Sequence, residues 1–331
     1  MKKFFVLLML MLVGLVPVTA QQTTVTPQDL ADPDGQFIDV NGAEIYYIER
    51  GNPEGPVVLL LHGFGGSTFT WRDNMDAIVE AGFRVIAFDR PPYGLSDKSP
   101  DLDYTVQGYS QLTAGVMDAL EVESAVLVGH SAGGGVIAQF AIDFPERVDA
   151  LVFVAGFVGG RGPAPTEEAT PEPEGGSGLD GLFQVVAGLD PNSPLAQGAI
   201  RTILTPERFV EILSGAYYDP SIVTEEVAAG YQRPLRLPGW EAGLLAVFSS
   251  DSPTVDDAQF SQVVETQQIP ILLIWGEEDT WVPLEAGLFL QEQVPSSQLI
   301  TYPLVGHLPM EENIDQFNAD LAAFLQALTP R

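Results

Sequence analysis

Short apolar runs alternate with longer periodic stretches along most of the chain. The runs are rich in Val, Ile, Leu and aromatic residues and are bounded by Gly, Pro or charged residues, which is typical of β-strands. They cover residues 37–40, 44–49, 57–61, 84–88, 125–128, 148–154, 271–275 and 299–302. Because several runs are apolar on both faces, we expect a mostly parallel sheet that helices cover on both sides.

Turn and helix signals fit the same arrangement. Asn41-Gly42 joins the first two runs and is a strong hairpin signal, so the sheet is expected to begin with an antiparallel pair. Between the later runs, apolar residues recur at helical spacing over residues 105–121, 136–144 and 317–325. Strands that alternate with helices predict an α/β fold with a doubly wound sheet of about eight strands. This core is expected over residues 36–156 and 269–331.

The alternation is interrupted over residues 157–268. Residues 159–181 combine Pro, Gly and acidic residues without apolar periodicity, which predicts a flexible linker. Helical patterns follow over residues 195–204, 206–218, 225–231 and 240–248. A helical insertion that leaves the sheet after the sixth strand and returns before the seventh is expected to form a cap, or lid, over the cleft.

The N-terminal residues have the pattern of a targeting segment. Lys2 and Lys3 precede an apolar stretch, and small residues before Gln21 offer a cleavage site, so residues 1–20 are interpreted as a signal peptide. The apolar stretch is shorter than the roughly 20 residues that a spanning helix needs, and an uncleaved membrane anchor is the lesser alternative. We therefore expect a secreted or periplasmic protein without a membrane span after cleavage. Residues 21–35 are polar and are predicted to be flexible.

Charge and composition exclude several classes of function. The formal net charge of −31 disfavours binding to nucleic acid or to anionic membranes. We interpret it as a solvated acidic surface, with adaptation to high salt as the alternative. The sequence has no cysteine, which excludes disulfides and thiolate chemistry. With three histidines and no His-Glu-x-x-His pattern, neither a metal site nor a cofactor is expected.

A Gly-x-Ser-x-Gly pattern follows one of the predicted strands directly. Residues 125–128 lead into a Gly-His-Ser-Ala-Gly turn over residues 129–133, and a helical pattern begins soon afterwards. A strand that turns into a helix so quickly forces a strained conformation at its tip, often with positive φ, which lifts the side chain into a cleft. Gly129 and Gly133 lack the Cβ atoms that would collide there. Ser131 is therefore predicted to be a nucleophile.

A serine nucleophile needs a base, and the base needs an orienting acid. His307 follows the last predicted strand and is expected to be the base. His62 and His130 lie in motifs of their own and are expected to bond to loop backbone. The acid should lie at a strand end between the serine and the histidine in chain order. Asp279 is the predicted acid, with Glu278 as its nearest competitor.

The oxyanion that forms during acyl transfer needs backbone donors. Phe64 lies in a glycine-rich stretch just after the strand predicted at residues 57–61, and its N–H can point inward. Ala132 opens the helix after Ser131, and the positive end of a helix favours negative charge. The N–H groups of Phe64 and Ala132 are therefore the predicted oxyanion hole.

Five segments occur in the order and spacing of the α/β-hydrolase fold family, which the chain resembles over nearly all of its mature length. These segments are His62-Gly63-Phe64-Gly65, Phe88-Asp89-Arg90-Pro91-Pro92-Tyr93-Gly94-Leu95-Ser96-Asp97, Gly129-His130-Ser131-Ala132-Gly133-Gly134, Trp275-Gly276-Glu277-Glu278-Asp279 and Gly306-His307. The resemblance implies a triad of Ser131, His307 and Asp279, an oxyanion hole from Phe64 and Ala132, and a helical cap.

Branches of this family differ in their nucleophile and in the residues around it. Haloalkane dehalogenases and epoxide hydrolases use an aspartate nucleophile, and Ser131 argues against both. The chain resembles the meta-cleavage carbon–carbon bond hydrolases over residues 231–240 and 275–283. Those enzymes commonly place Asn before the nucleophile and an aromatic residue after the histidine, where this chain has His130 and Leu308. Pro92 stands in a structural turn where relatives often carry glycine.

The predicted function is an exported serine hydrolase that cleaves a carboxylic ester or a related acyl substrate. Its substrate is expected to be a small, neutral, apolar molecule. Residues expected to line a hydrophobic acyl pocket are Phe183, Phe209, Tyr217, Tyr218, Trp240 and Phe248. A carbon–carbon bond hydrolase and a cofactor-free perhydrolase with the same triad are the alternatives, and a non-enzymatic binding protein on the same fold is a lesser one.

Overall fold

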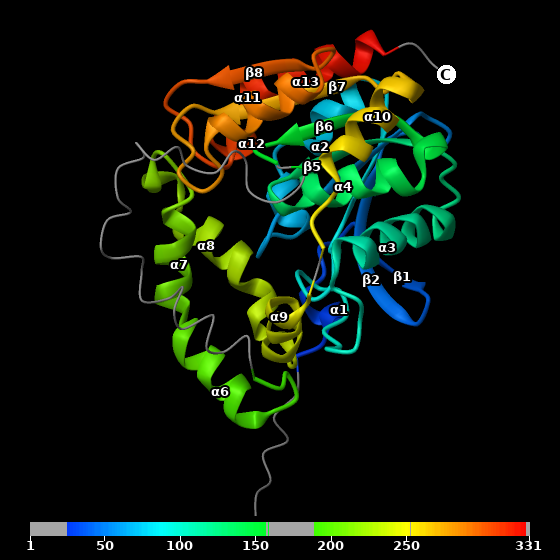
Figure 1. Cartoon of the computed structure of the whole chain (residues 1–331). Helices are drawn as coiled ribbons and strands as arrows, with labels where there is room; N and C mark the ends of the chain where they lie inside the picture. The colour runs from blue at the N-terminus through cyan, green and yellow to red at the C-terminus, as the bar shows by residue number, and fades with distance from the viewer. Residues whose placement is uncertain (1–24, 157, 159–188, 252, 329–331) are drawn as a thin grey trace, which may run out of the picture.

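A central sheet with helices on both faces forms the core of the computed structural model, and helices α6 to α9 gather apart from the sheet (Figure 1). The structure describes residues 25–156, 158, 189–251 and 253–328. The predicted signal peptide (residues 1–20) and the predicted linker (residues 159–181) lie outside the described residues.

The sheet has eight strands in the order β1-β2-β4-β3-β5-β6-β7-β8. Strand β2 runs antiparallel to β1 and β4, and the other neighbours are parallel. The strands are β1 (Gly35–Val40), β2 (Ala43–Arg50), β3 (Val57–Leu61), β4 (Arg84–Phe88), β5 (Ala125–His130), β6 (Val148–Val154), β7 (Ile271–Gly276) and β8 (Gln298–Tyr302). Asn41 and Gly42 form the first hairpin with positive φ, so the predicted mostly parallel sheet and its antiparallel start are confirmed.

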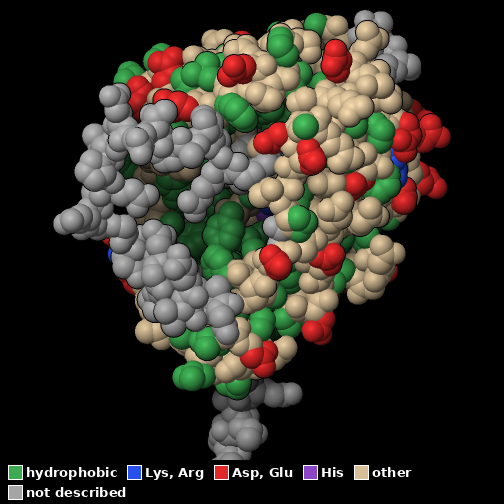
Figure 2. Space-filling view, viewed as in Figure 1, with side chains coloured by type: hydrophobic (Ala, Val, Ile, Leu, Met, Phe, Trp, Pro, Cys, Tyr) green, Lys and Arg blue, Asp and Glu red, His purple; other side chains and the backbone are tan. Residues whose placement is uncertain are grey.

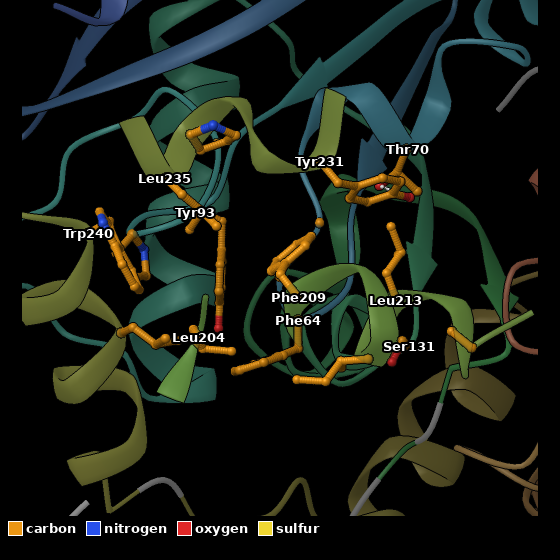
Figure 3. Close-up of a pocket in the computed structure, with 18 of the residues that line it drawn as sticks. Phe64, Thr70, Tyr93, Ser131, Leu204, Phe209, Leu213, Tyr231, Leu235 and Trp240 are labelled. Atoms are coloured by element: carbon orange, nitrogen blue, oxygen red, sulfur yellow. Dashed lines mark hydrogen bonds between the residues drawn. The ribbon is translucent and has the colours of Figure 1, made fainter. Parts of the chain in front are cut away.

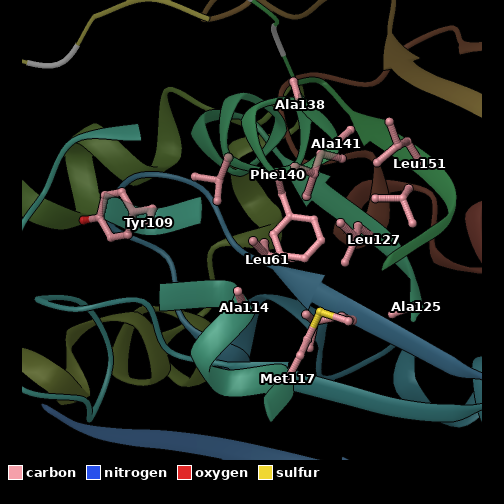
Figure 4. Close-up of a cluster of buried hydrophobic side chains, with 14 of the residues drawn as sticks. Leu61, Tyr109, Ala114, Met117, Ala125, Leu127, Ala138, Phe140, Ala141 and Leu151 are labelled. Atoms are coloured by element: carbon pink, nitrogen blue, oxygen red, sulfur yellow. The ribbon is translucent and has the colours of Figure 1, made fainter. Parts of the chain in front are cut away.

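Side chains from the two faces of the sheet enter two separate hydrophobic clusters. Leu59 and Leu61 of β3 belong to the cluster that α3, α4, α10 and α11 cover, whereas Val58 and Leu60 belong to the cluster under α2 and α13. Figure 4 shows Phe140 of α4 within the first cluster, close to Leu61. The helices are α2 (Met75–Glu80), α3 (Val106–Ala119), α4 (Ala132–Asp143), α10 (Asp257–Gln267), α11 (Leu284–Gln293), α12 (Pro309–Glu312) and α13 (Ile314–Ala327). Both faces are therefore covered, as a parallel sheet requires.

The insertion after β6 supplies the cap that the sequence predicts. Its helices are α6 (Pro194–Ile203), α7 (Pro206–Ser214), α8 (Glu225–Gln232) and α9 (Trp240–Ser249). Helix α10 also lies between β6 and β7, but it packs on the sheet beside α4, and its Phe260 contacts Phe153 with ring centroids 5.9 Å apart. Within the part of the chain that the structure describes, no helix has the length and hydrophobicity that crossing a membrane requires.

The described part of the N-terminal segment is attached to both the core and the cap. Residues Pro27–Leu30 form the short helix α1, with a capping box between Thr26 and Asp29. Asp32 binds Arg233 of the cap through both of its carboxylate oxygens, at 2.7 and 2.9 Å. It also accepts a hydrogen bond from the Tyr46 hydroxyl of β2. The sequence predicted a flexible segment over residues 21–35, and these contacts hold residues 26–32 in place.

Close packing around Gly133 predicts a strong effect of a single methyl group. A Cβ on Gly133 would lie 2.6 Å from the carbonyl oxygen of Leu61, which is rigid backbone at the end of β3. We expect Gly133→Ala to lower the free energy of unfolding by about 2–3 kcal/mol, because the overpacked helix must shift. The measurement is urea-induced unfolding followed by circular dichroism.

Gly198→Ala is the matched control, since it makes the same chemical change within another helix. A Cβ on Gly198 would have no described atom within 4 Å. Alanine is the better helix former, so this variant should be as stable as the parent or more stable by up to about 1 kcal/mol. Equal effects of the two substitutions would show that the contact between α4 and β3 is not tight.

Candidate active site

A cavity of about 300 Å³ lies between the carboxyl ends of the strands and the cap. Figure 2 shows hydrophobic side chains gathered inside a hollow on this face, with acidic side chains scattered around it. Of the aromatic residues predicted for the acyl pocket, Phe209, Trp240 and Phe248 line the cavity. Tyr217 is buried behind the wall and Tyr218 is exposed, while Phe183 lies outside the described residues.

Ser131 lies at the sharp turn between β5 and α4 and lines the cavity (Figure 3). Its backbone has φ 50° and ψ −121°, a conformation that L-residues rarely adopt. The Ser131 N–H donates to the Val154 carbonyl of β6 at 3.0 Å, which ties the turn to the sheet. A Cβ on Gly129 would lie 2.6 Å from the Gly133 carbonyl oxygen, so only glycine leaves room for this turn.

His307 and Asp279 are buried side by side and are joined by a hydrogen bond. The distance from His307 Nδ1 to Asp279 Oδ2 is 2.8 Å. The other carboxylate oxygen, Oδ1, accepts the N–H groups of Trp281 at 2.8 Å and Val282 at 2.9 Å, which fixes the orientation of the carboxylate. Because Nδ1 carries the hydrogen that Asp279 accepts, Nε2 is the nitrogen left to exchange a proton.

Three contacts hold the loop that carries His307. Its N–H donates to the Ala216 carbonyl of the cap at 2.8 Å, and its carbonyl lies 2.9 Å from His130 Nε2. Glu278, the alternative candidate for the acid, instead accepts the Val305 N–H through Oε2 at 3.1 Å. The geometry thus pairs Asp279, and not Glu278, with the imidazole.

The other two histidines bond to the backbone, as the sequence predicted. His62 Nδ1 lies 2.8 Å from the Gly63 carbonyl, and its Nε2 accepts the Arg90 N–H at 2.9 Å. Burial, followed by nearby positive charge, holds the pKa values of His62 and His130 well below the usual range, so both side chains are neutral. Among the described residues, no three His, Asp or Glu side chains are grouped to hold a metal ion.

The two predicted oxyanion donors lie next to Ser131. Ala132 is the first residue of α4, and the N–H of a first helical residue has no acceptor within its own helix. Phe64 follows Gly63, where a Cβ would lie only 2.9 Å from the Cβ of Ser131. The loop after β3 therefore passes close to the nucleophile, and Phe64 lines the cavity.

Two side chains near His307 were missed by the sequence analysis. The Trp281 ring lies over the His307 ring, with centroids 5.4 Å apart and planes tilted by 33°. Glu311, four residues after the base, is buried and binds Arg72 at 2.6 Å. The position of Trp281, two residues after the candidate acid, was a usable signal, whereas Glu311 looks like any other acidic residue of the chain.

Comparison with known proteins agrees with this geometry. A model of the α/β hydrolase fold matches residues 56–314, a range that includes every predicted site residue. The chain belongs to the α/β-hydrolase fold family. The eight-stranded, mostly parallel sheet and the helical insertion after β6 confirm the fold class that the sequence predicted.

Hydrolases from several bacteria are similar to this chain in sequence or in structure. The chain is 31% identical over 301 residues to a 2-hydroxy-6-oxononadienedioate/2-hydroxy-6-oxononatrienedioate hydrolase of Pseudomonas sp., covering 88% of this chain and 96% of that one. It is 29% identical to an uncharacterized hydrolase of Bacillus subtilis, covering 87% and 96%. A solved meta-cleavage product hydrolase from Pseudomonas fluorescens is 28% identical, with a TM-score of 0.68, covering 89% and 98%.

The buried neutral histidines predict a loss of stability in mild acid. Their pKa values in the folded protein are lowered, so below about pH 6.5 the unfolded chain binds more protons than the folded one. Each histidine should then lower the free energy of unfolding by up to about 1.4 kcal/mol per pH unit. The measurement is urea unfolding between pH 7.5 and pH 5.

A His130→Asn variant isolates one of these two contributions. Its stability should fall with a slope that is smaller by about 1.4 kcal/mol per pH unit over the same range, because one titrating group is gone. Identical slopes in the parent and the variant would mean that His130 is not held neutral in the folded protein.

Proposed function

We propose that this α/β hydrolase is a serine hydrolase that cleaves neutral carboxylic esters through an acyl-enzyme intermediate. The single observation that carries the proposal is that His307, which is hydrogen-bonded to Asp279 at 2.8 Å, lines the same cavity as Ser131. The strained backbone at Ser131 supports it, because strain of this kind is typical of functional turns.

In the proposed reaction, each group has one task. His307 Nε2 takes the proton of the Ser131 hydroxyl as its oxygen attacks the ester carbonyl carbon. Asp279 stabilises the imidazolium that results, and the N–H groups of Phe64 and Ala132 bind the oxyanion. The alcohol leaves with the proton from His307. Water then attacks the acyl-enzyme by the same route, which releases the acid and restores Ser131.

The cavity favours a neutral substrate over a carboxylate. Lys98 is the only Lys or Arg among the described lining residues, and its Nζ donates to the carbonyls of Tyr93, Gly94 and Ser96 at 3.2, 2.7 and 2.6 Å. This side chain therefore has no donor left for a substrate carboxylate.

Carbon–carbon bond hydrolysis is the second candidate, and sequence similarity supports it. The names of the substrates of the Pseudomonas relative at 31% identity end in "dioate", which denotes a dicarboxylate. A dicarboxylate bound in a buried site needs cationic partners. Because the engaged Lys98 does not supply one, we favour the ester as substrate.

We also propose that residues 1–20 direct export, so that the enzyme works outside the cytoplasm on small molecules. The charged and then apolar sequence of this segment supports the proposal. Mass spectrometry of the protein from cell fractions checks it: an exported protein should begin at Gln21. A protein that retains residue 1 and remains in the membrane fraction would favour the anchored alternative.

The nucleophile can be tested with a fluorophosphonate probe and an ester panel. We expect the probe to label Ser131 of the folded enzyme, and we expect Ser131→Ala to lose labelling and to lower kcat on p-nitrophenyl esters of graded chain length by about 10⁴-fold or more. Ser261→Ala, on the core helix α10, is the matched control and should keep both activities. Equal turnover by the enzyme and Ser131→Ala would refute the proposed nucleophile.

Asp279 and Glu278 are neighbours in the sequence, so substitutions at both positions test which of them orients His307. Asp279→Asn should lower kcat by about 10⁴-fold, because the amide cannot stabilise the imidazolium or hold the correct tautomer. Glu278→Gln keeps an oxygen to accept the Val305 N–H, so its kcat should stay within about threefold of the parent. The reverse order of effects in the ester assay would assign the role of the acid to Glu278.

A further inference from the structure

A buried carboxylate behind the cavity wall binds three donors. Glu311 Oε2 accepts Arg72 Nη2 at 2.6 Å and the Tyr217 hydroxyl at 2.8 Å. Its other oxygen, Oε1, accepts the hydroxyl of Tyr231 from α8. Burial and the Glu311 charge raise the pKa values of both tyrosines, so each remains a phenol with one hydrogen. Tyr231 therefore gives its only hydrogen to Glu311.

This arrangement fixes the direction of the next hydrogen bond. The Tyr231 hydroxyl lies 3.2 Å from Thr70 Oγ1, and Figure 3 shows this contact. Because the Tyr231 hydrogen is already used, Thr70 must be the donor. A threonine hydroxyl has one hydrogen and two lone pairs, so Thr70 Oγ1 keeps only acceptor capacity for any other partner.

The residue that carries the oriented hydroxyl lines the same cavity as Ser131 and His307. Thr70 and Tyr231 both line the cavity. A Cβ on Gly66 would lie 3.1 Å from Thr70 Oγ1, which places the hydroxyl beside the loop that carries Phe64. Much of the remaining wall is apolar, and Phe209 and Leu213 are labelled with these residues in Figure 3. An acyl chain bound in this cavity would thus meet an oriented acceptor, Thr70 Oγ1, on a largely apolar wall.

We propose that Thr70 Oγ1 is a subsite for a hydrogen-bond donor, so that the enzyme selects acyl substrates with a hydroxyl or N–H group close to the scissile carbonyl. The inference rests on the proposed ester hydrolysis and names its substrate class. A carboxylate or ketone at this place offers only acceptor oxygens and would face the lone pairs of Thr70. Hydroxyacyl esters satisfy the subsite, whereas oxoacyl esters do not.

Matched esters test the direction of the hydrogen bond. The p-nitrophenyl esters of 2-hydroxybutyrate and 3-hydroxybutyrate are compared with those of 2-oxobutyrate and 3-oxobutyrate, after subtraction of spontaneous hydrolysis. The readout is the ratio of kcat/KM for the hydroxy ester to that for the oxo ester. A neutral hydrogen bond changes kcat/KM by about two- to tenfold. We therefore expect the ratio to be higher by about this factor in the parent enzyme than in the variants Thr70→Val and Tyr231→Phe.

Two variants test whether the substrate donates a hydrogen bond to Thr70 Oγ1 or only packs against it. Thr70→Val removes the acceptor, so hydroxy esters should lose their advantage. Tyr231→Phe removes the group that receives the Thr70 hydrogen, so the hydroxyl can turn and donate into the cavity. In Tyr231→Phe, kcat/KM for the oxo ester should therefore rise relative to the hydroxy ester, by about two- to tenfold. A purely structural role of Tyr231 would lower both values together.

Tyr218→Phe is the matched control, since the Tyr218 side chain is exposed at the cap surface. Its ratio should equal that of the parent. Fluorophosphonate labelling of Ser131 checks that each variant is folded, and Thr70→Val suffices for the test if Tyr231→Phe does not fold. Ratios that stay within twofold of the parent in Thr70→Val would overturn the subsite. Failure of the parent enzyme to cleave any ester would instead overturn the proposed function.

Discussion

The candidate site depends on the tight backbone packing at the turn between β5 and α4. A Cβ on Gly129 would collide with the Gly133 carbonyl, and a Cβ on Gly133 would collide with the Leu61 carbonyl of β3, so neither position has room for one. The chain can make this turn only with Ser131 at φ 50°, a conformation that costs on the order of 1–3 kcal/mol. The hydrogen bond of Ser131 to Val154 and the covered sheet around it offset this cost. The position of Ser131 on the cavity wall thus follows from backbone packing.

The parallel arrangement of the strands brings the other candidate residues to the same edge of the sheet as Ser131. The loops after β3, β5, β7 and β8 all leave the sheet at its carboxyl edge, where ligands bind in open α/β sheets. These loops carry Phe64, Ser131, Asp279 and His307. Phe64, Ser131 and His307 line one cavity although they lie up to 243 positions apart in the sequence, and Asp279 is bonded to His307 behind them. Ser131, His307 and Asp279 therefore keep their relative positions as long as the sheet register is kept.

The sequence was sufficient for the elements with strong local signals. Each strand is a short apolar run between polar boundaries, and each predicted site residue follows such a run directly. Helices α10 and α11 were missed because few of their residues are buried: Phe260 and Val264 in α10, and Gly287 and Leu290 in α11. A helix with so narrow a buried stripe has a weak periodic pattern.

The polar network at Glu311 shows a different reason why sequence analysis fell short. Its partners Arg72, Tyr217 and Tyr231 lie 239, 94 and 80 positions away along the chain. No local pattern distinguishes Glu311 from the other acidic residues of a chain with 45 of them. Only the fold brings these donors together, so the direction of their hydrogen bonds had to come from the structure.

Hydrogen bonds connect the cap to the segment around His307. The Ala216 carbonyl accepts the His307 N–H at 2.8 Å, and the Tyr218 N–H donates to Glu312 at 2.7 Å. Glu312 also accepts the Gly306 N–H at 2.9 Å, directly before the base. Movement of residues 216–218 away from the sheet would break these bonds and displace His307 from Asp279. Substitutions that shift the backbone of residues 216–218 should therefore act through the position of the imidazole, whereas a change confined to the exposed Tyr218 side chain should not.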